Sequence, residues 1–222
     1  MYDMRQVVVI DTGIDMNNRN LNKHIIGGTG FSCSNQQILE DHLYQDDNGH
    51  GTMCADTILQ VYNEAQFYVI KIANSEGKTS TSLLQRALLK CLSLNIKYIC
   101  VSLAVTTAAY RQELFDITRQ LVDQNKFVFV SVKNDSRSSY PASLPSVIGV
   151  AGQALLSNEL FSFSASKAIQ AVFDDSPLFV YTLANRFAFF KGTSKANALC
   201  VGMSLKLIHG VKGNCERNYR TD

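Results

Sequence analysis

The feature that most constrains this chain is a series of five short apolar segments, each separated from the next by a longer stretch of mixed polarity. The segments are rich in β-branched and aromatic residues and span 6–11, 66–72, 98–103, 127–132 and 147–151. They are nearly continuous in apolar character rather than alternating. That pattern is typical of strands buried on both faces of a parallel sheet.

Two of the intervening stretches have the periodicity of amphipathic helices. Apolar residues recur every three or four positions in 80–94, at Leu83, Leu84, Ala87, Leu88, Cys91 and Leu92, and in 110–124, at Leu114, Ile117, Leu121 and Val122. Strands that alternate with helices predict an α/β fold, with a mostly parallel central sheet and helices on both faces. No repeat, linker or break in composition interrupts the pattern, so we expect a single domain over 1–222.

The composition argues against several classes of function. The net charge is +2 and there is no basic cluster, which argues against nucleic-acid binding. No apolar run approaches the roughly 20 residues that span a bilayer, and a cleaved signal peptide would remove the first strand. The six cysteines form no CxxC pair and no zinc-ligand pattern, so we expect a cytoplasmic protein without a metal or cofactor.

Three polar motifs coincide with the ends of these segments. Asp-Thr-Gly at 11–13 closes the first strand. His-Gly-Thr at 50–52 precedes an apolar helical pattern at 53–61, and Gly-Thr-Ser at 192–194 precedes another at 196–208. Ligands of an open parallel sheet bind beyond the carboxyl ends of its strands. We therefore expect Asp11, His50 and Ser194 to meet at one edge of the sheet.

A carboxylate, an imidazole and a hydroxyl are the components of acyl transfer by a nucleophilic serine. Asp11 would orient the ring of His50, His50 would act as general base, and Ser194 would be the nucleophile. Asp-Thr-Gly also occurs in aspartic proteases, but these need two such aspartates and this chain has one such motif. Taken alone, the histidine motif would be typical of a turn and the serine motif of a loop. Together with the aspartate motif they favour a catalytic triad.

The order Asp, His, Ser and the three motifs resemble those of the subtilisin-like serine proteases, the subtilase family. The resemblance covers about residues 7–207 and leaves 210–222 as a flexible or partner-bound tail. It implies a subtilisin-like three-layer fold and a serine endopeptidase that hydrolyses peptide bonds through an acyl-enzyme. It also implies that Asn134, which precedes a family-like stretch at 140–150, donates a hydrogen bond to the oxyanion.

Two further segments resemble the substrate-binding parts of the family. Ser102, Leu103 and Ala104 resemble the strand beside the first specificity pocket, and Gly77 and Lys78 resemble a loop that pairs with an extended substrate. Binding by added-strand pairing would take its affinity from main-chain hydrogen bonds and its selectivity from side-chain pockets.

The chain departs from the family pattern at several positions. Lys195 follows the nucleophile where the family has methionine, and Lys133 replaces the glycine before the oxyanion asparagine. Lys133 either narrows the first specificity pocket, contacts an acidic or polar substrate group, or points to solvent. Cys54 follows His50 by one helical turn, but no cluster of further metal ligands accompanies it. Segment 53–72 lacks the calcium-binding loop of many relatives, so we expect no structural calcium.

No segment resembling an inhibitory prodomain precedes residue 7. We therefore expect a small intracellular endopeptidase that acts on a peptide or protein substrate and trims precursor or leader peptides. A homo-oligomer or a partner that covers truncated edges is compatible with the short chain. Two alternatives stay open: a catalytically silent peptide-binding module, and an acyl-transferase or peptide ligase that uses the same triad.

Overall fold

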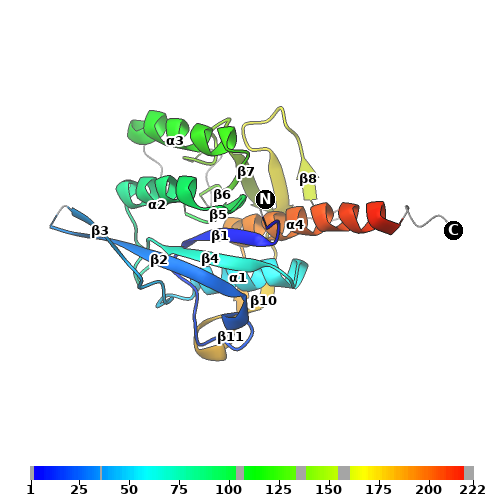
Figure 1. The fold of residues 1–222 in the computed structure, drawn as a ribbon, viewed down its shortest axis with the longest axis horizontal. Coiled ribbons are helices and arrows are strands. Elements are labelled where there is room, and N and C mark those ends of the chain that lie inside the picture. The colour runs from blue at the N-terminus through cyan, green and yellow to red at the C-terminus, as the bar shows by residue number, and fades with distance from the viewer. Residues whose placement is uncertain (1–2, 36, 104–107, 134–138, 155–160, 218–222) are drawn as a thin grey trace.

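A nine-stranded sheet forms the centre of the molecule (Figure 1). The computed structural model describes residues 3–35, 37–103, 108–133, 139–154 and 161–217, with side chains described up to 209. The strands have the order β3-β2-β4-β1-β5-β6-β7-β9-β8, and only the edge strands β3 and β8 pair in antiparallel fashion. Their bounds are β1 Gln6–Asp11, β2 Ile25–Ser34, β3 Gln37–Asp41, β4 Gln66–Lys71, β5 Tyr98–Val101, β6 Phe127–Ser131, β7 Ile148–Gln153, β8 Phe161–Phe163 and β9 Ala171–Asp174.

Helices cover both faces of the sheet. Figure 1 shows α2 and α3 together on one face and α1 and α4 on the other. The helices are α1 His50–Val61, α2 Thr81–Ser93, α3 Arg111–Asp123 and α4 Thr193–Arg217, with short 3-10 helices at Asn22–His24, Ala108–Tyr110 and Leu183–Asn185. A separate hairpin of β10 (Leu178–Tyr181) and β11 (Phe187–Phe190) packs against α1. The predicted three-layer α/β architecture is confirmed.

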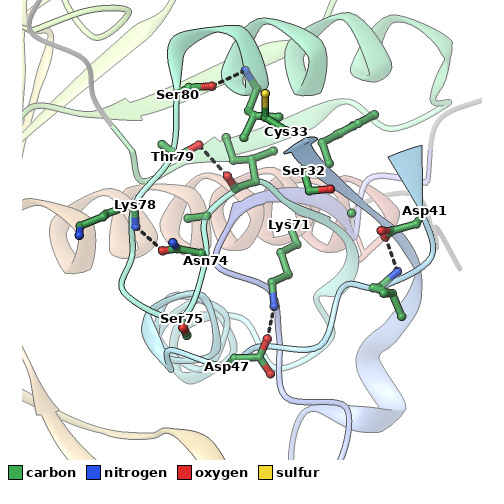
Figure 2. A pocket seen from close by; sticks show the side chains of 16 residues that line it. Ser32, Cys33, Asp41, Asp47, Lys71, Asn74, Ser75, Lys78, Thr79 and Ser80 are labelled. Atoms are coloured by element: carbon green, nitrogen blue, oxygen red, sulfur yellow. Dashed lines mark hydrogen bonds and ion pairs between the residues drawn. The ribbon is translucent and has the colours of Figure 1, made fainter. Parts of the chain in front are cut away.

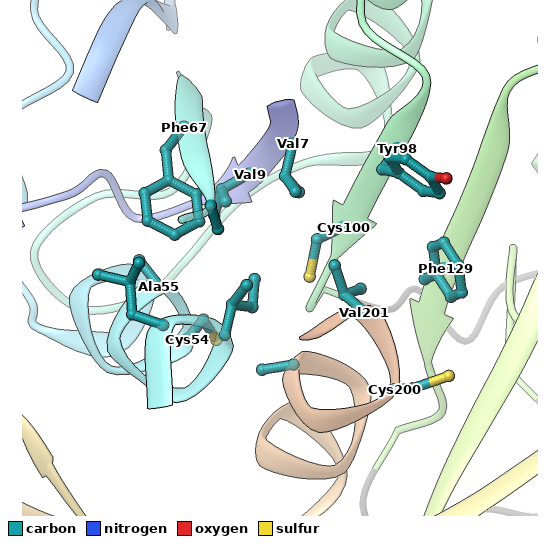
Figure 3. Packing of buried hydrophobic residues seen from close by; sticks show 14 of the residues in the cluster. Val7, Val9, Cys54, Ala55, Phe67, Tyr98, Cys100, Phe129, Cys200 and Val201 are labelled. Atoms are coloured by element: carbon teal, nitrogen blue, oxygen red, sulfur yellow. The ribbon is translucent and has the colours of Figure 1, made fainter. Parts of the chain in front are cut away.

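The core consists of two apolar clusters, one on each face of the sheet. Successive residues of β1 point to opposite faces, so Val7 and Val9 join the cluster beneath α1 and α4, whereas Val8 and Ile10 join the one beneath α2 and α3. Figure 3 shows the first cluster, where β1, α1 and α4 meet. Burial on both faces explains why β1 is apolar at every position from 7 to 10.

The predicted elements agree closely with the structure. All five predicted strands form, although β5 ends at Val101 rather than 103. The helix predicted at 80–94 is α2, and the Ser80 hydroxyl caps it by accepting a hydrogen bond from the backbone N–H of Leu83. Helix α4 starts earlier and continues further than the apolar pattern at 196–208 predicted.

Six strands were not predicted: β2, β3 and β8 to β11. β2 contains three glycines, at 27, 28 and 30, and glycine is disfavoured in strands. β8 to β11 have three or four residues each, too few for a periodic pattern to stand out. Among the helices of the described residues, none combines the length and apolar character needed to cross a bilayer.

Candidate active site

Asp11 and His50 form a hydrogen-bonded pair at the carboxyl end of β1. Asp11 is the last residue of β1 and has no exposed surface, and His50 is the first residue of α1. Nδ1 of His50 lies 2.7 Å from Oδ1 of Asp11, and the backbone N–H of Thr12 donates to the same oxygen at 2.7 Å. Because an ionised carboxylate only accepts, Nδ1 carries the proton, and Nε2 of the neutral ring is left as the basic atom.

The surroundings of His50 favour its protonated form. Burial disfavours the charged imidazole, but the charge of Asp11, the hydrogen bond to it and the charge of Asp46 outweigh burial and raise the pKa of His50. The side chain of His50 is 27% exposed, so the ring reaches solvent on one side. The ring of Phe190 meets it edge-on, with 5.5 Å between centroids.

A buried carboxylate fixes the start of α1. Oδ1 of Asp46 accepts hydrogen bonds from the backbone N–H groups of Asn48 (2.9 Å) and Gly49 (2.8 Å). Its Oδ2 accepts from the backbone N–H of Thr52 (3.0 Å) and from the Thr52 hydroxyl (2.6 Å). A negative charge at the N-terminus of a helix satisfies free N–H groups and opposes the positive end of the helix dipole. Asp46 therefore sets the residue at which α1 begins, which is His50.

Gly51 allows α1 to approach the chain that leaves β1. A Cβ atom at this position would lie 2.1 Å from the carbonyl oxygen of Gly13 and 3.1 Å from Cβ of Asp11. No larger side chain fits without moving one backbone away from the other. The glycine that follows the histidine is thus a condition for the short distance between His50 and Asp11.

Ser194 lies in the first turn of α4, after a glycine with φ of 91° at position 192. Its hydroxyl donates to the carbonyl oxygen of Ser102, just beyond β5, at 3.4 Å. Between these described residues there is no hydrogen bond from Ser194 to His50. The structure therefore brings Asp11 together with His50, and Ser194 together with Ser102.

Two buried cysteines, Cys54 of α1 and Cys100 of β5, each contact one of these pairs, and Figure 3 shows both cysteines in the same cluster. Sγ of Cys54 lies 3.6 Å from Oδ2 of Asp11, and Sγ of Cys100 lies 3.8 Å from Oγ of Ser102. Nδ2 of Asn197, on α4, donates to Oγ of Ser102 at 3.4 Å. Burial raises the pKa of both thiols, that of Cys100 to about 12, so both are neutral. β1, α1, β5 and α4 thus contribute to one continuous cluster.

Asp11, His50 and Cys54 are the described residues with the potential to hold a metal ion, since their ligand atoms all lie within 4.8 Å of one another. A metal would require the thiolate of Cys54. Burial and the charge of Asp11 raise the pKa of this thiol well above its ordinary value, and its S–H donates to Asp11. The three groups are satisfied by hydrogen bonds among themselves, and the absence of a metal stays a prediction.

The predicted substrate loop borders a cavity of about 870 Å³ between the β2–β3 hairpin and the chain from β4 to α2 (Figure 2). Lys78 lines this cavity together with Asn74 and Thr79, whereas none of the triad residues does. The backbone N–H of Gly77 donates to the carbonyl oxygen of Asn74 at 2.9 Å. The backbone N–H of Lys78 donates to the side-chain oxygen of Asn74, also at 2.9 Å. These two N–H groups are engaged in a turn and are not free to pair with a peptide.

Of the remaining predicted residues, Ser102, Leu103 and Lys133 follow the ends of β5 and β6. Ser102 is buried and Leu103 half-buried directly after β5. Lys133 is exposed, and its backbone N–H donates to the Ser139 hydroxyl at 2.9 Å. Ala104 and Asn134 lie outside the described residues, so the oxyanion donor stays a prediction.

Sequence reasoning missed four residues of this region: Asp46, Asn197, Phe190 and Asp174. Asp46 had no signal, since a capping residue is expected immediately before the helix and Asp46 lies four residues before His50. Asn197 and Phe190 had none, because nothing local indicates that they contact β5 or His50. The ammonium of Lys195, predicted to lie near the nucleophile, contacts Asp174 instead.

Known proteins resemble this chain in sequence and in fold. The model of the subtilase family matches residues 5–213. A curated relative, the intracellular serine protease of Paenibacillus polymyxa, is 26% identical over 214 residues, which cover 89% of this chain and 64% of the relative. The chain thus spans less than two thirds of that relative's length.

A solved structure has the same fold. The crystal structure of a cold-adapted subtilisin-like serine proteinase superposes with a TM-score of 0.75 at 18% identity, over 92% of this chain and 75% of that one. The predicted subtilisin-like fold is therefore confirmed. Since the family model covers nearly the whole chain, the protein belongs to the subtilase family.

Proposed function

We propose that this protein is a serine endopeptidase in which Ser194 is the nucleophile, His50 the general base and Asp11 the residue that orients the base. The observation that carries the proposal is the 2.7 Å hydrogen bond between buried Asp11 and Nδ1 of His50. It selects the tautomer with a basic Nε2 and stabilises the imidazolium that forms when Nε2 accepts a proton.

The reaction requires one change in the position of the Ser194 hydroxyl. It now donates to Ser102 and would turn to donate to Nε2 of His50. Such catalytic hydrogen bonds often tighten only when substrate binds. His50 then takes the hydroxyl proton as Oγ attacks the carbonyl carbon, and returns it to the leaving amine. The N-terminus of α4 and the amide of Asn134 would stabilise the oxyanion.

The substrate class would be extended peptides or protein segments. Their main chain would lie along Ser102, Leu103 and Ala104 and beside Gly77 and Lys78. In this loop the carbonyl of Gly77 would accept the hydrogen bond from the substrate, since the carbonyl of Lys78 already accepts from the backbone N–H of Asn74 at 3.0 Å. Exposed Lys133 would contact an acidic or polar group of the substrate. A role in trimming precursor or leader peptides would give such a protease the selectivity that a cell requires.

We place the protein in the cytoplasm. The five cysteines among the described residues are free thiols, as expected in a reducing compartment, and the Paenibacillus relative is called intracellular. We also propose that the edges of the sheet are covered in an assembly of several copies or by a partner protein.

A fluorophosphonate probe tests the nucleophile. The probe should label the wild-type protein, and Ser194→Ala should abolish both labelling and cleavage of a peptide library analysed by mass spectrometry. Ser204→Ala is a matched control in the same helix, because its hydroxyl only donates to the carbonyl of Cys200, and it should leave both unchanged.

Each alternative function has its own outcome in this experiment. A folded wild-type protein that is not labelled would be a silent peptide-binding module. A labelled protein whose products carry a new amine, rather than water, would be an acyl-transferase or ligase. Labelling that persists in Ser194→Ala would refute the assignment of the nucleophile.

A further inference from the structure

A lysine is buried directly beside the proposed nucleophile. Lys195 follows Ser194 in the first turn of α4 and is only 3% exposed. Its ammonium donates to Oδ2 of Asp174 at 2.6 Å and to the backbone carbonyl of the same residue at 2.9 Å. Asp174 ends β9, so this ion pair ties the first turn of the catalytic helix to the sheet.

The carboxyl group of Asp174 is ionised at neutral pH. Burial disfavours the carboxylate of Asp174, but hydrogen bonds from Lys195 and Ser176 outweigh burial and lower its pKa to about 2. Lys195 is buried, whereas the side chain of Asp174 is 27% exposed. Desolvation of the buried ammonium offsets much of its attraction to the carboxylate, so the pair adds little net stability compared with apolar side chains of similar size. Stability alone therefore gives no physical reason for a lysine at this position.

The end of β9 holds the chain on both sides of Ser194. The backbone N–H of Gly192, two residues before the nucleophile, donates to the carbonyl of Asp175 at 3.1 Å. Lys195, one residue after it, binds Asp174. The nucleophile therefore lies on a short segment whose two ends are attached to two adjacent residues, Asp174 at the end of β9 and Asp175 directly after it.

Asn197 attaches the opposite side of this turn to the sheet. Its Nδ2 lies 3.1 Å from the carbonyl oxygen of Val101, at the end of β5, and 3.5 Å from that of Phe129 in β6. The first turn of α4 is thus bound to β9 on one side and to β5 and β6 on the other. Of these attachments, only the one to Asp174 depends on two opposite charges.

We infer that the Lys195–Asp174 ion pair is a positioning device for Ser194, which sets the direction of the first turn of α4 and hence the approach of Oγ to His50. This inference rests on the proposed function. Lys195 would thus affect the rate of the catalytic step by positioning Ser194, without contacting the substrate or the reacting atoms. Loss of the pair should therefore lower kcat without weakening substrate binding.

Three variants separate this role from a purely structural one. Lys195→Met and Asp174→Asn each leave one charge without its partner and should lower the thermal midpoint of unfolding. The double variant removes both charges and should recover most of the lost midpoint. Its kcat for a peptide substrate should nevertheless stay about 10- to 100-fold below that of the wild type, with KM within about twofold, as misplacement of a reacting group predicts.

Lys126→Met is the matched control. Lys126 is likewise a buried lysine, 2% exposed, but its ammonium donates to the carbonyls of Cys91 and Leu94 at the end of α2, away from Ser194. This variant should lose stability and keep the kcat of the wild type. The rate constant of fluorophosphonate labelling, measured on the folded fraction, gives a second readout for any variant that folds poorly.

The outcomes are distinct. A double variant that recovers both the midpoint and the kcat of the wild type would overturn the positioning role, as would a kcat loss equalled by Lys126→Met. A slow labelling rate in the double variant, with the midpoint restored, supports it. A wild-type protein that neither reacts with the probe nor cleaves peptides would refute the proposed function itself, which is a separate result.

Discussion

At the scale of single residues, hydrogen bonds within the candidate site determine which atoms remain free to react. Oδ1 of Asp11 accepts from both Thr12 and His50, so His50 is held with Nδ1 protonated. Local motifs identified these residues because a triad needs specific side chains flanked by glycine. Asn197 was not predictable, since its partners on β5 and β6 are about 70 to 100 residues away in sequence.

The pH dependence of activity follows from His50. The general base must be neutral, and the structure raises the pKa of His50 above its ordinary value of 6.5. The protonated, inactive form therefore persists to higher pH than for an isolated histidine. We expect kcat/KM to fall as pH decreases, with a midpoint above 6.5, in a pH profile measured with a peptide substrate. A midpoint below that value would contradict the ring environment described above.

Cys54 should make the protein sensitive to mercurials. Its sulfur lies 3.6 Å from Asp11 and 4.0 Å from Nδ1 of His50, so a bulky metal on sulfur would disturb their hydrogen bond. Burial and a raised pKa slow the reaction, so partial inactivation over hours is expected. Residual peptidase activity measures it, and Cys54→Val should abolish it. Equal loss in both proteins would show that another thiol, such as exposed Cys33, is responsible.

At the scale of elements, the first residue of α1 is determined by a tertiary contact as well as by the local sequence. The apolar pattern began at 53, whereas the helix begins at His50 because Asp46 caps it from the preceding loop. A repeating apolar pattern identifies the residues that a helix buries. A capping residue is a single polar residue outside the helix, so it does not contribute to that pattern. β2, which is interrupted by glycines, and the short strands β8 to β11 were missed because they also lack a recognisable apolar pattern.

The cap should contribute measurably to stability. Asp46→Ala leaves the N–H groups of Asn48, Gly49 and Thr52 without their partner in a buried setting. We expect the free energy of unfolding to fall by about 2–3 kcal/mol in urea denaturation.

A neighbouring acid provides the control for this measurement. Asp47 is 58% exposed on its side chain and pairs with Lys71 at the surface, so Asp47→Ala should cost about 0–1 kcal/mol. If both variants lost the same free energy, the cap would have no special part in holding α1.

At the scale of the whole molecule, the class of fold was predictable and the arrangement of its edges was not. Central parallel strands such as β1 are apolar on both faces, and this pattern is visible without knowledge of their neighbours. The edge strands β3 and β8 are largely exposed and carry no such pattern. Their positions depend on pairing with β2 and β9, which only the folded chain reveals.

The proposed nucleophile belongs to α4, the last helix of the fold, whereas its orienting carboxylate ends the first strand. During translation, Asp11 and His50 leave the ribosome long before Ser194 has been synthesised. Under the proposed function, a nascent chain without Ser194 would therefore have no hydrolytic capability toward itself or toward neighbouring polypeptides. Proteolysis would become available only when synthesis has passed Ser194 and α4 has docked, so the order of these residues along the chain would delay self-digestion during translation.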